Sequence, residues 1–292
     1  MKVRAAIPLA SMARTIVASL ACLGSTATTV RAETCALPWQ NTGNTVTELG
    51  SQGSSMLLVA AAVTPVLAAP TGFDHEARRF AQGPLGGRYD LEPVTVVVPW
   101  LVPPAALLAH LEAQASGACT LQRTSAAVLQ GTLLTAAAVV ALKGVTGRAW
   151  PNGDGDPTAP DRLDHPEWSR SFDPFSGRLS SAWPSGHAAI MVAAAAAIDG
   201  TGEAPSAAWT LYGASALVGA GMIVGDHHYV SDVASGALIG FVIGHAAGRA
   251  FAFTAGGSDD ASPGEHTRAG PRWHVTPLLG DGLGGAAIAG TL

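Results

Sequence analysis

Six apolar segments alternate with polar stretches along the chain. They are Met56–Ala69, Val94–Ala109, Ser125–Leu142, His187–Ile198, Ala207–Val224 and Asp232–Gly248. Each segment is 12 to 18 residues long and rich in Ala, Gly and Leu, which is typical of helices more than of strands. The pattern therefore predicts an all-α fold with a six-helix core.

Polar stretches and prolines divide this pattern further. Two long polar stretches cover 74–92 and 152–183, and Pro65, Pro99, Pro103 and Pro104 predict kinks or ends of helices. We expect an N-terminal segment at 33–54, a helical domain at 55–250 and a Gly- and Ser-rich flexible linker at 251–272. In the tail at 273–292, a Gly-Asp-Gly turn predicts a short β-hairpin.

The first 32 residues have the pattern of a secretory signal peptide. Basic Lys2 and Arg4 come first, a short apolar stretch covers Ile16–Leu23, and Val30-Arg31-Ala32 is typical of a cleavage site. The sequence thus predicts export to the cell envelope. Cys35 and Cys119 would remain in the exported chain, either as a disulfide worth ~4 kcal/mol or as two unpaired thiols.

The charge content excludes some classes of protein. Only 13% of residues are charged, against about 25% in a typical soluble domain. Such a chain is neither intrinsically disordered nor a general nucleic-acid binder, since it lacks a basic face. Without residues 1–32 it has 12 basic and 21 acidic residues, a net charge of −9, and therefore no general attraction for anionic lipids.

Two environments suit the apolar segments. The uncharged windows 49–73, 124–142 and 204–225 are long enough to span a bilayer, while 187–198 is short. In a membrane, Arg78, Arg79 and Arg88 would place the first loop, and with it Lys143, on the cytoplasmic side. A soluble periplasmic domain is the alternative. Nothing in the sequence indicates an oligomeric state.

Two candidate anion-binding features follow one another. Lys143 is the single lysine after residue 32 and ends an apolar helix, where it could also simply cap the helix dipole. Ser185, Gly186 and His187 open the next apolar helix, whose free N–H groups favour a phosphate oxygen. The alternative is a plain helix cap at Ser185.

A third cluster pairs a histidine with a carboxylate. His228 and Asp232 are four residues apart, so on a helical turn they point the same way. A carboxylate bound to one imidazole nitrogen leaves the other nitrogen free as a base or nucleophile. A structural His–Asp cap is the alternative, and a metal site lacks a third ligand at regular spacing.

Taken in order, these clusters resemble the type 2 phosphatidic acid phosphatase superfamily, which includes vanadium haloperoxidases and bacterial acid phosphatases. The resemblance covers about Ser125–Gly248. The family motifs are Lys-x6-Arg-Pro, Pro-Ser-Gly-His and Ser-Arg-x5-His-x3-Asp. Residues 184–187 match the second motif completely, and His228 and Asp232 match the end of the third.

The chain departs from the motifs at both arginine positions. Trp150 stands at the arginine of the first motif, and Gly221-Met222 stand at the Ser-Arg pair of the third. Arg148 is the nearest substitute. Further candidate cations are His227, Arg170 and Arg178.

The resemblance implies a six-helix phosphatase fold and a mechanism. The expected enzyme hydrolyses a phosphomonoester, either a lipid phosphate or a small envelope metabolite. His228 would attack phosphorus, Asp232 would hold its ring, and His187 would protonate the leaving oxygen. The expected phosphate ligands are Lys143, Arg148, Ser185 and Gly186.

The resemblance implies no metal or other cofactor for phosphatase chemistry. Vanadate would be bound only in a haloperoxidase, which is a lesser alternative. The other alternative is a non-catalytic or anion-binding helical homologue, motivated by Trp150 and Met222.

Overall fold

The computed structural model describes residues 35–85, 92–151, 159, 161–177, 179–253, 272–280 and 283–291. It divides into two compact units, Met1–Ala255 and Gly256–Leu292. The signal peptide expected at 1–32 lies outside the described residues and stays a prediction. The same holds for most of the linker expected at 251–272, since the last helix runs to Phe253.

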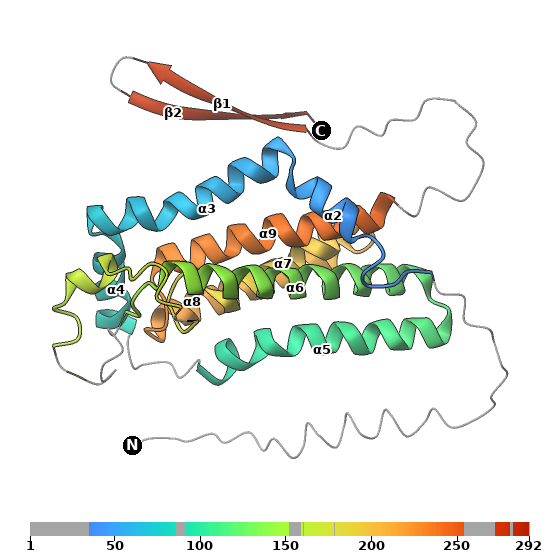
Figure 1. Ribbon diagram of the computed structural model, residues 1–292, viewed down its shortest axis with the longest axis horizontal. Coiled ribbons are helices and arrows are strands. Elements are labelled where there is room, and N and C mark those ends of the chain that lie inside the picture. The colour runs from blue at the N-terminus through green and yellow to red at the C-terminus, as the bar shows by residue number, and fades with distance from the viewer. Residues whose placement is uncertain are drawn as a thin grey trace. The chain divides into compact units, whose positions relative to one another are not determined.

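The first unit is helical (Figure 1). Its elements are α2 (Thr42–Leu49), α3 (Gln52–Thr71), α4 (Phe73–Phe80), the π-helical turn η1 (Ala81–Leu85), α5 (Glu92–Ser116), α6 (Cys119–Thr146), the 3-10 turn η2 (Pro166–Arg170), α7 (Gly186–Thr201), α8 (Pro205–Val224) and α9 (Val230–Phe253). Helices α3 and α5 to α9 contain the six predicted segments and extend them. The predicted all-α fold is confirmed.

The structure adds two details to the predicted pattern. Pro65 lies inside α3, and Pro99, Pro103 and Pro104 lie inside α5, yet both helices continue through them. Each proline removes one N–H from the hydrogen-bond ladder, and the remaining bonds carry the helix on. The polar stretch at 74–92 contains α4, because its charged side chains are buried in ion pairs with other parts of the chain.

Helices α7 and α9 run parallel with their backbones in contact. A Cβ built on four glycines of α9 would lie 2.1–2.3 Å from a carbonyl oxygen of α7 or of its N-cap residue. The glycines are Gly236, Gly240, Gly244 and Gly248, and the carbonyls belong in the same order to Ser185, Ala189, Ala193 and Ala197. Any side chain at these four positions would push the helices apart. Because the glycines and the carbonyls meet in the same order along both helices, the two N-termini lie at the same end of the pair.

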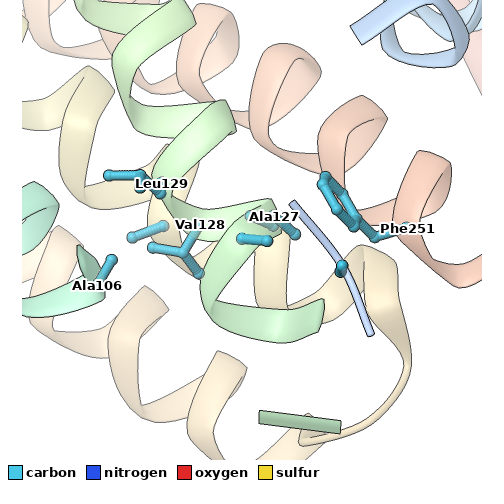
Figure 2. Close-up of a cluster of buried hydrophobic side chains, with 9 residues drawn as sticks. Ala106, Ala127, Val128, Leu129 and Phe251 are labelled. Carbon is cyan, nitrogen blue, oxygen red and sulfur yellow. The ribbon is translucent and has the colours of Figure 1, made fainter. Parts of the chain in front are cut away.

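Helix α6 packs antiparallel to this pair. A Cβ on Gly131 would lie 3.2 Å from Gly244 and 3.6 Å from Ala197, whereas one on Gly186 would lie 3.5 Å from Val139. The end of α6 therefore lies beside the beginning of α7. At its other end, Ala127, Val128 and Leu129 of α6 join Ala106 and Phe251 in a buried apolar cluster (Figure 2).

A disulfide and two hydrogen bonds attach the part of the chain before α4 to this bundle. A disulfide joins Cys35 to Cys119 at the start of α6. Thr45 donates a buried hydrogen bond to the Gln130 side chain over 2.8 Å, and Ser235 donates one to the Ala61 carbonyl, also over 2.8 Å. With a rise of about 1.5 Å per residue, α6 carries the chain about 36 Å from the disulfide to Lys143.

Within the part of the chain that the structure describes, five helices are long and apolar enough to cross a membrane: α3, α5 from Val94 on, α6, α8 and α9 to Ala252. In α3, α5 and α8, at most a third of the most apolar stretch is buried. Exposed side chains on these helices include Val59, Leu67, Leu108, Trp209 and Leu217, each more than 60% exposed. Apolar faces of this extent are typical of surfaces that a lipid or a partner covers.

The second unit contains an antiparallel pair of strands. β1 covers Arg272–Gly280 and β2 covers Leu283–Thr291. The register runs from Arg272 opposite Thr291 to Gly280 opposite Leu283.

The contact between α7 and α9 predicts a position-specific effect of added methyl groups. Gly244→Ala places a Cβ 2.2 Å from the Ala193 carbonyl oxygen, so it should lower the free energy of unfolding by about 2 kcal/mol or more. Gly213→Ala on α8 meets nothing within 4 Å and should raise it by about 0.5–1 kcal/mol. Denaturant unfolding followed by circular dichroism compares the two. Equal stability of both variants would contradict the close packing.

Candidate functional site

Three of the expected site side chains line one pocket at the end of α6. The pocket holds about 280 Å³ and is bordered by Lys143, His187 and His228, together with Gly186 at the start of α7. Two tryptophans and five aliphatic side chains complete its wall: Trp100, Trp150, Ala136, Val139, Val140, Leu179 and Ile190. The site is therefore a small polar centre in an apolar wall.

The start of α7 presents free backbone N–H groups to this pocket. Ser185 is its N-cap, and the Ser185 hydroxyl accepts a 3.5 Å bond from the Ala188 N–H. Ser185 is fully buried, and its own N–H donates to the Asp232 carbonyl over 3.0 Å. The helix start, with Gly186 at the wall, is a natural place for an anionic oxygen. The structure uses the Ser185 hydroxyl as the cap.

His228 lies in the turn before α9 and faces both His187 and Asp232. The centroids of the two histidine rings are 6.4 Å apart, and Nδ1 of His228 lies 3.7 Å from Oδ2 of Asp232. Burial lowers the pKa of His228, and the carboxylate of Asp232 offsets only part of this effect. A neutral imidazole with Nδ1 toward Asp232 keeps Nε2 available as a nucleophile.

Lys143 supplies a positive charge to the pocket. Its ammonium group donates to the Ser181 carbonyl and lies 5.1 Å from the centroid of the Trp150 ring. Among the described residues that form the wall, Lys143 is the only lysine or arginine. The pocket thus offers one fixed cation and one helix N-terminus to an anion.

Arg148, expected to hold phosphate, instead lies in a buried ion-pair network. Its Nη1 donates to Asp232 over 2.5 Å and to the Ser231 hydroxyl over 2.7 Å. Its Nη2 donates to Asp74 over 2.7 Å and to the Ser169 carbonyl over 2.8 Å. Burial opposes the charge, but Asp232 and Asp74 prevail and raise the pKa of Arg148. The structure therefore places Arg148 behind Asp232, outside the pocket wall.

Helix α4 adds two residues that sequence reasoning missed. Asp74 accepts hydrogen bonds from the Ser231 N–H and hydroxyl, at 3.0 and 2.5 Å, besides the one from Arg148. Arg78 forms two 2.7 Å bonds to Asp226. These contacts hold both ends of the turn that carries His228. No local pattern relates residues 148 or more positions apart, so the sequence carried no signal for them.

Neither motif-arginine position supplies a cation. The Trp150 ring lies 5.0 Å from the His228 ring, and Met222 is fully buried. A Cβ on Gly221 would lie 2.2 Å from Thr95 of α5, which leaves no space for the serine of the motif.

Arg170, another candidate arginine, is not part of the described pocket wall. Arg170 donates to the Ala69 carbonyl over 3.2 Å. Arg178 lies outside the described residues.

One known family matches part of the chain. Residues 125–253 match the family model of the PAP2 superfamily, the type 2 phosphatidic acid phosphatases and their relatives. The match covers less than half of the chain, and the members of that superfamily are generally phosphatases. No curated protein and no solved structure matches the chain.

Replacing Arg148 should lower the stability of the fold. Arg148→Met leaves Asp74 and Asp232 buried without their shared cation, which should cost about 3–5 kcal/mol of folding free energy. Arg123→Met breaks the more exposed pair with Glu203 and should cost less than about 1 kcal/mol. Chemical denaturation of both variants measures the difference. Two small, equal losses would show that Arg148 does not hold these carboxylates.

Proposed function

We propose that this chain is a phosphatase that hydrolyses a phosphomonoester through a phosphohistidine at His228. The observation that carries the proposal is the meeting of His228, His187 and Lys143 at the N-terminus of α7 in one pocket. A nucleophile, a second imidazole and an anion seat are the parts that metal-independent phosphoryl transfer needs.

The reaction would proceed in two steps. In the first, Nε2 of His228 forms a bond to phosphorus while the bond to the leaving oxygen breaks, and His187 delivers a proton to that oxygen. Asp232 would stabilise the charged ring, and Lys143 with the α7 N–H groups would hold the non-bridging oxygens. In the second step, water attacks phosphorus and gives a proton to His187, the P–N bond to His228 breaks and phosphate leaves.

The wall of the pocket favours a phosphate on an apolar carrier. Apart from the polar centre, the wall consists of tryptophan and aliphatic side chains. Trp100 and Val140 belong both to this wall and to the exposed apolar surface, at 55% and 48% exposure. A lipid phosphate could therefore reach the pocket along that surface, and we propose that lipid is its source.

We also propose that the bundle is embedded in a membrane of the cell envelope. Five helices of sufficient length and their exposed apolar faces support embedding, and the Cys35–Cys119 disulfide supports export. Protein in isolated membranes should stay in the pellet after an alkaline carbonate wash and enter solution with detergent. Release by carbonate alone would show a soluble domain instead.

A second candidate function is anion binding without catalysis. Trp150 at the arginine position and the engagement of Arg148 by Asp74 and Asp232 favour it, because the pocket then has a single fixed cation. Loss of a phosphoryl-stabilising arginine can cost ~10³-fold or more in rate.

Hydrolysis of an aryl phosphate and of a long-chain alkyl phosphate tests the first proposal. Detergent-purified protein should release phosphate without added metal, and His228→Ala should reduce the rate to background because it removes the nucleophile. His245→Ala, on α9 away from the pocket wall, is the control. Equal background rates for folded wild type and His228→Ala, with either substrate, would rule out the proposed hydrolysis.

Trp150→Arg separates the two candidates. A guanidinium at this position should raise kcat/KM of an active enzyme tenfold or more by stabilising the transferred phosphoryl group. Trp150→Phe keeps an aromatic ring and should bring no gain. If neither wild type nor Trp150→Arg hydrolyses substrate but inorganic phosphate protects both from thermal unfolding, the anion-binding candidate is favoured.

A further inference from the structure

Helix α5 contacts the second histidine of the site through Trp100 and the Val96 backbone. The Trp100 indole N–H donates to Nε2 of His187 over 3.2 Å, and the two rings meet edge to face with centroids 5.7 Å apart. The Val96 backbone, one turn earlier on α5, makes a further hydrogen bond with His187. Both contacts come from outside residues 125–253, the segment that matches the superfamily.

These contacts determine where the His187 proton lies. A ring nitrogen that accepts an N–H bond must present its lone pair, so Nε2 carries no proton while Trp100 binds it. The ring proton of the neutral imidazole is then on Nδ1. His187 is neutral in this arrangement, since a protonated Nε2 and the Trp100 N–H would be two donors facing each other.

We propose that Trp100 is a positioning residue that keeps resting His187 in the neutral tautomer with its proton on Nδ1. Burial of the ring also disfavours a positive charge on His187, and Lys143 from α6 acts in the same direction, whereas the hydrogen bond with the Val96 backbone favours the charge. His227 and His228, from the turn before α9, also lie near the ring. The indole thus adds a directional bond to an environment that already opposes protonation.

The consequence for catalysis rests on the proposed function. While Trp100 occupies Nε2, His187 has no proton to give at that nitrogen and no lone pair free for water. A substrate must displace the indole before His187 can take part in proton transfer. Trp100 is 55% exposed and belongs to the pocket wall, so an entering apolar group can contact it directly.

Nuclear magnetic resonance of ¹⁵N-histidine-labelled protein in detergent tests the tautomer without any catalysis. His187→Gln assigns the His187 signals, and their nitrogen shifts distinguish a proton on Nδ1 from one on Nε2. The wild type should show the Nδ1–H form at neutral pH. An Nε2–H form would overturn the proposal.

Trp100→Phe removes the indole N–H and keeps an aromatic ring. The midpoint of the His187 titration should move to higher pH by roughly 0.5–1 unit, the weight of one neutral hydrogen bond. Trp209→Phe, on the exposed face of α8, should leave the midpoint unchanged. A midpoint in Trp100→Phe equal to that of the wild type would show that Trp100 only packs against the ring.

Activity separates this inference from the proposed function. If the protein hydrolyses alkyl phosphate, Trp100→Phe should move the pH limb of kcat/KM that reports His187 in the same direction as the resonance midpoint, whereas a merely structural role would leave that limb in place. If hydrolysis is at background while the resonance shift occurs, the phosphatase proposal fails and the tautomer assignment stands.

Discussion

The backbone contact between α7 and α9 is the constraint on which the site depends. Four glycines of α9 lie against four carbonyls of α7 and its cap, each four residues from the next, and this packing makes the helices parallel. Their N-termini therefore converge, with the Ser185 N–H bonded to the Asp232 carbonyl. His187 follows the N-terminus of α7, and His228 precedes the N-terminus of α9. The glycine packing between the two helices, which involves no reactive group, therefore brings the two imidazoles to one pocket. The physical role of these four glycines is to let the two helices approach closely.

Around that pair, the rest of the chain supplies charge and orientation. Arg148 lies between Asp74 and Asp232, so the carboxylate behind His228 shares its cation with a residue of α4. On the other side of the pocket, Trp100 of α5 contacts His187. The segment that matches the superfamily contains the two histidines, while the side chains that orient them come partly from helices before it. The departures from the family motifs lie at Trp150 and at Gly221-Met222.

The sequence predicted the parts of this structure that have a local signature. Apolar runs of sufficient length predicted the six main helices, and the Pro-Ser-Gly-His string predicted the cap at Ser185. It could not predict the partners of Arg148, because Asp74 and Asp232 lie 74 and 84 positions away and no spacing rule connects them. The contact of Trp100 with His187 could not be predicted for the same reason, since 87 positions separate the two residues. The sequence did not predict helix α4 because its charged residues suggested exposure to solvent. The ion-pair partners of Asp74 and Arg78 lie instead inside the bundle.

The distances between these partners along the chain have a consequence for the order in which the protein is made. Asp74 leaves the ribosome long before Arg148, and Ser231 and Asp232 follow only near the end of the helical unit. Until Arg148 has emerged, the Asp74 carboxylate must stay hydrated, or α4 must remain apart from the apolar helices, because burial of the carboxylate without a cation is unfavourable. The charge network can close only after residue 232 has emerged. The newly made bundle is thus assembled with an open site, and the last helix completes it.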